Sequence, residues 1–295
     1  SFCIYQYKYY SLPPSLFLDL SLSLFITKNI ISAIEKSGTV ERFVHTSSTA
    51  AIRPEEWEDG EVLTTETFAK DATLEQNPYG LAKYSAEMVV RDWHKQKNDV
   101  KKPRMVTIHP CMVFGPPLSP RHLRGSLSII MMLVNRELPV LLPMQISIVD
   151  VRDVAEAHVR ALTMGEDGGR YLTVAGEMMW SDISKILKKE FPERKWPFRQ
   201  LSYYFALIVC AFHPRVSVSW AKRHLKNKLY WDATPAEKDL KMDSFGLHTL
   251  KRSYLYEGER PQYLWMRVSL GVHGNDIEKV QKIAGKRGAR SAPLC

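Results

Sequence analysis

Helices and strands alternate over residues 28–174, as the spacing of apolar residues along the chain indicates. Apolar residues three and four positions apart predict helices, and short runs rich in Val, Ile and Phe predict strands. The predicted helices cover residues 28–36, 77–97, 126–135 and 151–162. The predicted strands cover residues 40–46, 105–109, 146–149 and 170–174. This alternation predicts an α/β fold with a mostly parallel sheet and helices on both of its faces.

Beyond residue 165 the pattern predicts a smaller lobe. Residues 181–191 form an amphipathic helix pattern, and Ser181 is expected to cap that helix. Residues 205–212 are apolar throughout but too few to span a bilayer, so we expect a buried helix there. The chain then divides into an atypical N-terminal segment (1–25), a partial Rossmann-like catalytic domain (26–165), a substrate-binding lobe (166–243) and a basic tail with little core pattern, expected to be disordered (244–295).

Residues 52–76 separate two of the predicted elements and are polar and acidic, with few apolar runs. We expect a long surface loop in this region. Loops of this length often border an active site.

Composition excludes several classes of function. The net charge is +9, but no nucleic-acid recognition motif accompanies it, so nucleic-acid binding is not expected. The apolar residues 16–26 are too few for a membrane span and include Asp19. No metal site is expected, since the four cysteines lack the spacing of metal ligands, and their scatter fits a reducing compartment such as the cytoplasm. These cysteines are Cys3, Cys111, Cys210 and Cys295.

The segment 77–83 carries the most informative chemistry. Asn77 and Pro78 are typical of the first positions of a helix, which places Tyr79 and Lys83 one turn apart on one face. A nearby ammonium favours the phenolate, so this pair can exchange a proton near neutral pH. Ser48 follows the strand at 40–46 and can hydrogen-bond the same substrate oxygen. The trio indicates carbonyl reduction or alcohol oxidation, whereas the Tyr-x-x-x-Lys spacing alone also fits an ordinary helix face.

Four segments resemble, in chain order, the extended short-chain dehydrogenase/reductase family, which includes sugar-nucleotide epimerases and dehydratases. They are residues 42–48, 77–83, 109–116 and 148–155. The resemblance extends from about residue 26 to about residue 243 and implies a Rossmann-like fold. It also implies that Ser48, Tyr79 and Lys83 are catalytic, that Lys83 holds the nicotinamide ribose beside Tyr79, and that Pro110 and Val113 contact the nicotinamide.

Within this family the chain is most similar to dihydroflavonol reductases and cinnamoyl-CoA reductases. Residues 62–66, Glu87 and the Phe191-Pro192 pair carry this likeness. Hydroxysteroid dehydrogenases share the same segments. The resemblance implies NADP or NAD as cofactor and a small-molecule carbonyl or alcohol as substrate; a sugar-nucleotide epimerase or dehydratase is the alternative.

The chain departs from the family at the cofactor phosphates. Complete members hold the pyrophosphate with a glycine-rich loop at a helix N-terminus. No Gly-x-x-Gly-x-x-Gly occurs in residues 1–45, and Gly38 is the first glycine. We therefore expect an N-terminally truncated Rossmann-like sheet and poor cofactor binding. A truncated, cofactor-free relative without activity is the second hypothesis.

Several other residues have tempting chemistry but simpler structural explanations. Asn29 resembles a residue near the site in the family, although a polar residue on a helix surface explains it equally well. The histidines His45, His109 and His158 are expected to pack rather than to bind. We expect Tyr203, Tyr204 and Trp220 to pack in the core, and residues 222–228 to form a solvent-exposed face.

Overall fold

The computed structural model describes residues 14–96, 102–119, 123, 125–135, 137, 140–197, 199–212 and 218–242. The helices are α2 (Pro14–Ser37), α3 (Pro78–Lys95), α4 (Ser128–Val134), α5 (Val151–Ala161), α6 (Trp180–Glu190), α7 (Tyr203–Phe212), α8 (Val218–Lys226) and α9 (Thr234–Asp239), with a short 3-10 helix, η1 (Thr49–Ala51). The strands are β1 (Arg42–Thr46), β2 (Glu61–Leu63), β3 (Arg104–Pro110), β4 (Met112–Phe114), β5 (Gln145–Asp150), β6 (Gly169–Thr173), β7 (Gly176–Met179) and β8 (Leu229–Trp231). The predicted N-terminal segment lies partly, and the predicted tail wholly, outside these residues.

The described strands form small, mostly parallel sheets. The first has the order β1-β3-β6, and both of its strand pairs are parallel. In the second, β5 pairs in parallel with β4 and antiparallel with β7. The third joins β2 to β8 in parallel. The predicted α/β fold with mostly parallel pairing is confirmed, although the strands are divided among several sheets.

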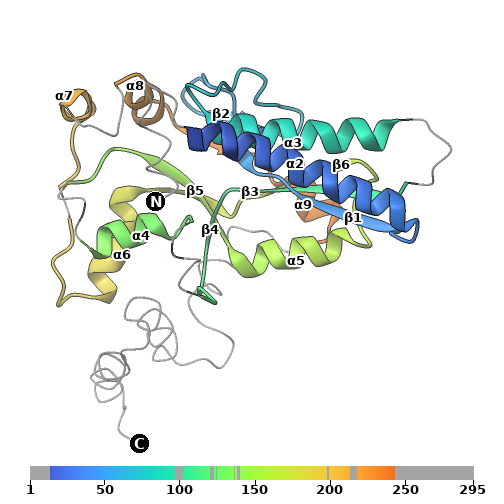
Figure 1. The fold of residues 1–295 in the computed structure, drawn as a ribbon. Coiled ribbons are helices and arrows are strands. Elements are labelled where there is room, and N and C mark those ends of the chain that lie inside the picture. Colours follow the sequence, from blue (N-terminus) through green and yellow to red (C-terminus); the bar gives the residue numbers. More distant parts are fainter. Residues whose placement is uncertain are drawn as a thin grey trace, which may run out of the picture.

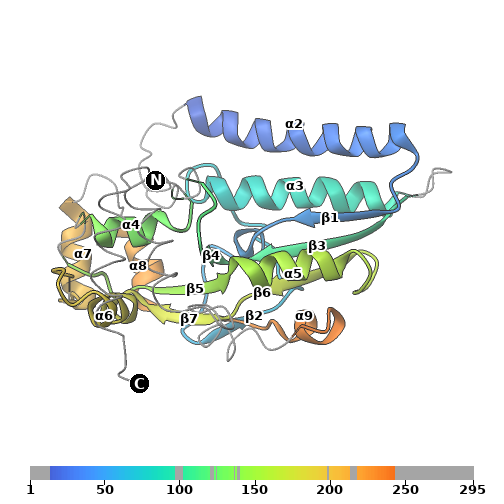
Figure 2. The same ribbon diagram turned by 90° about the horizontal axis from the view of Figure 1, so that it is seen from below.

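Strand β3 is covered by helices on both faces, which accounts for its continuous burial. Met105 packs against α2 and α3, whereas Val106 and Ile108 belong to the core formed with α5 and α9. This alternation follows from the two-residue period of a strand. Figures 1 and 2 show α2 beside α3 on one side of β1 and β3, with α5 on the other side. His109 consequently faces α3.

Helix α2 is longer than the sequence pattern predicts. It begins at Pro14 rather than residue 28, so it crosses the predicted boundary between residues 25 and 26. The reason is that no glycine or proline interrupts the chain between Pro14 and Gly38. The end at Ser37 agrees with the prediction, because Gly38 adopts a left-handed φ of 60° that suits the residue after a helix.

The expectation of a surface loop over residues 52–76 is wrong for its middle. Strand β2 lies there and pairs with β8, from the far end of the described chain. Ile52 and Leu63 are buried in the core beside this pair. A strand of three residues leaves little period-two signal, and its partner is distant in sequence, so the pattern did not reveal it.

Helices α4, α6, α7 and α8 gather at one end of the molecule (Figure 1). Helix α6 begins at Trp180 after Met179, without a side-chain cap, so the prediction that Ser181 caps it is wrong. Within the described residues, no helix is both long and apolar enough to cross a membrane.

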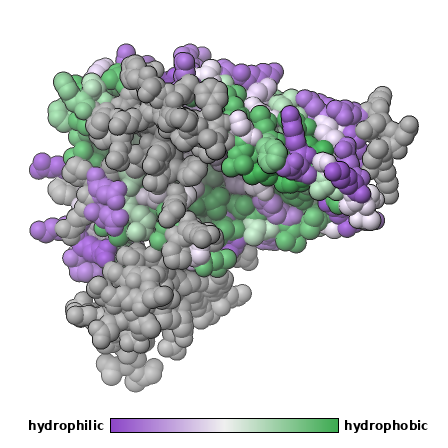
Figure 3. Space-filling model, viewed as in Figure 1, coloured by the Kyte–Doolittle hydropathy of each residue, from purple (hydrophilic) through white to green (hydrophobic). Residues whose placement is uncertain are grey.

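Helix α7 is buried on one face only. Ala206 and Cys210 pack against α8. The opposite face exposes Tyr204, Phe205, Ile208 and Phe212, at 78%, 54%, 54% and 86% of their surface. The space-filling view shows hydrophobic surface in the region of α7 and α8 (Figure 3). The helix predicted to be buried is therefore buried on one face only, and the prediction of Tyr204 as core is wrong.

Candidate functional site

The carboxyl ends of β1 and β3 lie at the same edge of their sheet because the two strands are parallel. Ser48 follows β1 and caps η1, its Oγ accepting a hydrogen bond from the Ala50 N–H at 3.2 Å. The same Oγ lies 3.5 Å from the carbonyl oxygen of Pro110, the last residue of β3. Two of the predicted site residues, Ser48 and Pro110, are thus in contact.

The start of α3 is fixed by the cap that the sequence predicts. Asn77 Oδ1 accepts a hydrogen bond from the Gly80 N–H at 2.9 Å, and Pro78 occupies the first turn. A Cβ on Gly80 would lie 2.4 Å from the Asn77 side chain, so glycine is required for this close approach. The cap places Tyr79 and Lys83 in the first turns of the helix, beside η1.

Lys83 joins the helix to the end of β1. Its Nζ donates a hydrogen bond to the Thr46 carbonyl oxygen at 3.4 Å and lies 6.0 Å from the centroid of the Tyr79 ring. The side chain is half-buried, and burial lowers the pKa of the ammonium. Tyr79 is 37% exposed, so its ring is open to solvent beside a half-buried cation.

Val113 lies on β4, in the neighbouring sheet. Its N–H donates a hydrogen bond to Ser126 Oγ at 3.2 Å, and its side chain packs against the core beneath α5. The chain reaches this strand directly from Pro110 through Cys111. Val113 is therefore close to Pro110 in sequence, while its side chain packs against the core.

A buried ionic cluster beneath the site went unrecognised in the sequence. Glu87, on α3, is fully buried and accepts three hydrogen bonds of 2.7 Å, from Ser47 Oγ, His109 Nε2 and Arg170 Nε. Arg170 also donates to the carbonyl oxygens of residues 65 and 67. Burial alone would raise the pKa of Glu87, but these three donors hold it well below its usual value.

The charges of this cluster balance within it. Burial lowers the pKa of His109, and we assign it as neutral, with Nε2–H donating to Glu87. The guanidinium of Arg170 remains protonated and supplies the positive charge opposite the carboxylate. His109 is buried, as expected, but it is also a hydrogen-bond donor. A carboxylate between Ala86 and Val90 on an otherwise apolar helix face was the signal that could have revealed the cluster.

The other two histidines considered above, His158 and His45, are held by hydrogen bonds or buried. His158 Nε2 accepts a hydrogen bond from the Thr46 hydroxyl at 2.8 Å, and its Nδ1 donates to the Val154 carbonyl oxygen at 2.7 Å. Burial in β1 lowers the pKa of His45 to about 4.

Asn29 is exposed on α2. The lysines at the expected solvated face are exposed: Lys222, Lys226 and Lys228.

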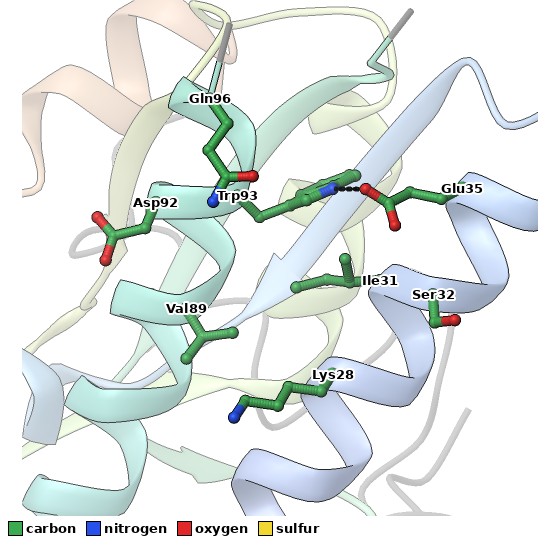
Figure 4. A pocket seen from close by; sticks show the side chains of 8 residues that line it. All are labelled: Lys28, Ile31, Ser32, Glu35, Val89, Asp92, Trp93 and Gln96. Carbon is green, nitrogen blue, oxygen red and sulfur yellow. Dashed lines mark hydrogen bonds between the residues drawn. The ribbon is translucent and has the colours of Figure 1, made fainter. Parts of the chain in front are cut away.

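A groove of about 310 Å³ lies between α2 and α3 (Figure 4). Its lining residues are Lys28, Ile31, Ser32, Glu35, Val89, Asp92, Trp93 and Gln96. Trp93 Nε1 donates a hydrogen bond to Glu35 at 2.8 Å across it. The groove lies along the second half of α3, and none of the predicted site residues lines it. Among the described residues, no cluster of His, Cys, Asp and Glu is arranged to hold a metal ion.

Comparison with known proteins gives consistent matches. Cinnamoyl-CoA reductase 1 of Petunia hybrida is 33% identical over 174 residues, covering 58% of this chain and 50% of that protein. The NADPH-dependent methylglyoxal reductase GRE2 of Saccharomyces cerevisiae is 31% identical over 186 residues, covering 57% of this chain and 54% of that protein. The chain thus spans about half the length of the curated relatives it matches.

The fold is that of solved reductases. The crystal structure of Gre2 from Candida albicans with NADPH superposes with a TM-score of 0.60 at 23% identity, covering 86% of this chain and 71% of that one. The model of the NAD dependent epimerase/dehydratase family matches residues 20–174, more than half of the chain. This stretch contains every predicted site residue. The chain therefore belongs to the NAD dependent epimerase/dehydratase family.

Proposed function

We propose that the chain acts as an NAD(P)-dependent oxidoreductase that interconverts a carbonyl and an alcohol on a small molecule. The observation that carries this proposal is the position of the Lys83 ammonium, between the Tyr79 ring and the end of β1. A half-buried cation beside an accessible phenol favours proton exchange by that phenol.

The residues fit the nicotinamide end of the cofactor. Lys83 and Tyr79 would hold the ribose, and Pro110 and Val113 would contact the ring. The cofactor, when bound, supplies or accepts the hydride. The fit is poorer at the phosphates, because the 295 residues contain no glycine-rich fingerprint to direct backbone N–H groups at them.

Tyr79 is the proposed proton donor to the carbonyl oxygen during reduction and the acceptor during oxidation. Lys83 favours the phenolate that remains after the proton has left. Ser48 would hydrogen-bond the same substrate oxygen and orient it. Its hydroxyl is suited to this, because the bond to the Pro110 carbonyl oxygen is long, at 3.5 Å, and easily exchanged for a stronger one.

Reduction of an aldehyde, ketone or thioester with NADPH is the direction that we favour. The two named relatives are a cinnamoyl-CoA reductase and a methylglyoxal reductase, and both names describe the reduction of a carbonyl. The family model matches residues 20–174, which include the proposed site, and this supports the same class of substrate here.

A second candidate is a relative that retains the catalytic side chains but does not bind the cofactor. The observation in its favour is the missing glycine-rich sequence. The two candidates differ in a direct measurement, because only the first gives a change in NADPH fluorescence on titration and a carbonyl-dependent loss of NADPH absorbance.

The test of the proposal is the Tyr79→Phe variant, assayed with a panel of aldehydes, ketones and CoA thioesters at millimolar NADPH. Removal of the phenolic hydroxyl should lower turnover by about 100-fold or more. Tyr84→Phe is the matched control, because Tyr84 lies on the same helix and stacks edge-on against Phe68. Equal turnover in Tyr79→Phe and Tyr84→Phe, or no turnover in the unaltered chain, would reject the proposal.

A further inference from the structure

The fully buried carboxylate of Glu87 contacts the residue directly before each of two site residues. Ser47 precedes Ser48, and His109 precedes Pro110. Both Ser47 Oγ and His109 Nε2 hydrogen-bond one oxygen, Glu87 Oε2, at 2.7 Å. We infer that Glu87 is a positioning residue, which holds Ser48 and Pro110 in register with the helix that carries Tyr79 and Lys83. This inference rests on the proposed function.

The helix spacing supports this role. Tyr79, Lys83 and Glu87 are four residues apart in succession, so they lie along one face of α3. Lys83 reaches the end of β1, and Glu87 reaches Ser47 and His109 beneath it. A shift of α3 along the sheet would therefore displace the phenol and break the contacts of Glu87 together.

The strands reach the same carboxylate from the other side. Ser47 also donates its N–H to the Ile108 carbonyl oxygen at 2.8 Å, which ties the end of β1 to β3. Arg170, on β6, binds the second carboxylate oxygen at 2.7 Å. All three strands of the β1-β3-β6 sheet or their ends thus converge on one side chain of α3.

The cluster differs from an ordinary fold contact in its connection to the site. Removal of a contact that only stabilises the fold should lower stability without making Ser48 and its neighbours more mobile. A positioning contact should, when weakened, release the segment 47–51 while the rest of the chain stays folded. Local release would also lower kcat more than it raises KM, because misplaced reacting groups slow the chemical step.

Ser47→Ala is the most selective test, because it removes one donor and leaves the Glu87–Arg170 pair intact. Amide exchange of residues 48–51, followed by mass spectrometry, should become about tenfold faster, as the loss of one buried hydrogen bond implies. With NADPH and a carbonyl substrate, kcat should fall by about tenfold or more, and KM should change less than twofold. Glu87→Gln should have the same effects more strongly, provided that it folds.

Tyr171→Phe is the matched control. The Tyr171 hydroxyl is buried, accepts a hydrogen bond from the Glu166 N–H at 2.7 Å and donates to Asp239, away from Ser48. Its removal should lower the melting temperature without altering exchange at residues 48–51 or kcat. If amide exchange of residues 48–51 is as slow in Ser47→Ala as in this control, Glu87 only stabilises the fold and the inference is wrong. If the unaltered chain shows no turnover, the proposed function fails, and amide exchange alone then decides the positioning role.

Discussion

The two ends of the molecule differ in what they bury: one end buries charged and polar side chains, and the other exposes apolar ones. Around α3 and the β1-β3-β6 sheet, a carboxylate, a guanidinium and an imidazole are buried, and the carboxylate accepts hydrogen bonds from both of the other groups. At the other end, α7 exposes four large apolar side chains to solvent. Buried polar groups therefore mark the better specified end, because each requires a particular partner, whereas exposed apolar groups require none.

The largest effect should come from breaking the cluster outright. Glu87→Ala leaves the buried Arg170 without its counter-charge, so we expect a loss of about 3–5 kcal/mol in the free energy of unfolding. Urea unfolding followed by circular dichroism measures this loss. Asp182→Ala is the control, because it removes an exposed ion pair with Lys185 and should change stability by less than about 0.5 kcal/mol. A small effect of Glu87→Ala would remove the contrast between the two ends.

The pH dependence of stability should be set by a residue at the same end of the molecule as the Glu87 cluster. Burial lowers the pKa of His45 from its ordinary 6.5 to about 4, so between these values the unfolded chain binds the extra proton. Stability should therefore fall as the pH drops from 6.5 to 4, by up to about 3 kcal/mol. His45→Leu should reduce this slope. Equal slopes in the two proteins would show that another group is responsible.

Lys83→Met separates activity from stability. Turnover should fall at least tenfold, and the pH profile of alcohol oxidation should move to higher pH, because the phenolate loses its neighbouring cation. Burial lowers the pKa of Lys83, so the charged form is disfavoured by folding, and the melting temperature should stay level or rise. Lys95→Met, an exposed position in the last turn of α3, should alter neither. An unchanged rate and profile in Lys83→Met would leave Lys83 without a catalytic role.

The smallest effect on stability should appear at α7. Phe212→Ser replaces a side chain that is 86% exposed, so unfolding should change by less than about 0.5 kcal/mol. The amount of protein that remains in solution on concentration should nevertheless increase, since an exposed apolar patch favours self-association. Val159→Ser, at a position on α5 that is 65% exposed, is the comparison and should have little effect on either property. A large loss of stability in Phe212→Ser would mean that α7 is better packed than its exposure indicates.

Local signals made the positions of the candidate site residues predictable. The start of α3 depends on Asn77, Pro78 and Gly80, which are consecutive or nearly so, and the phase of the helix then places Tyr79 and Lys83 together. Ser48 was predictable because it follows a short strand. The predicted roles of these residues remain predictions, since the structure gives their positions and not their chemistry.

Long-range contacts were not predictable in the same way. The partners of Glu87 come from the end of β1, from β3 and from β6, and they lie up to 83 positions from Glu87 in the chain. The pairing of β2 with β8 joins segments that are further apart still. The exposed face of α7 was missed for a related reason, because an apolar run does not show whether another element is available to cover it.

The contacts of Arg170 have a consequence for motion near the site. This guanidinium donates to the carbonyl oxygens of Thr65 and Thr67 and lies 3.9 Å from the centroid of the Phe68 ring. Opening the segment around Phe68 would expose the guanidinium together with its carboxylate partner and break several bonds at once. We therefore expect this segment to form a rigid wall on the timescale of turnover, so that substrate entry and product release depend on movement elsewhere.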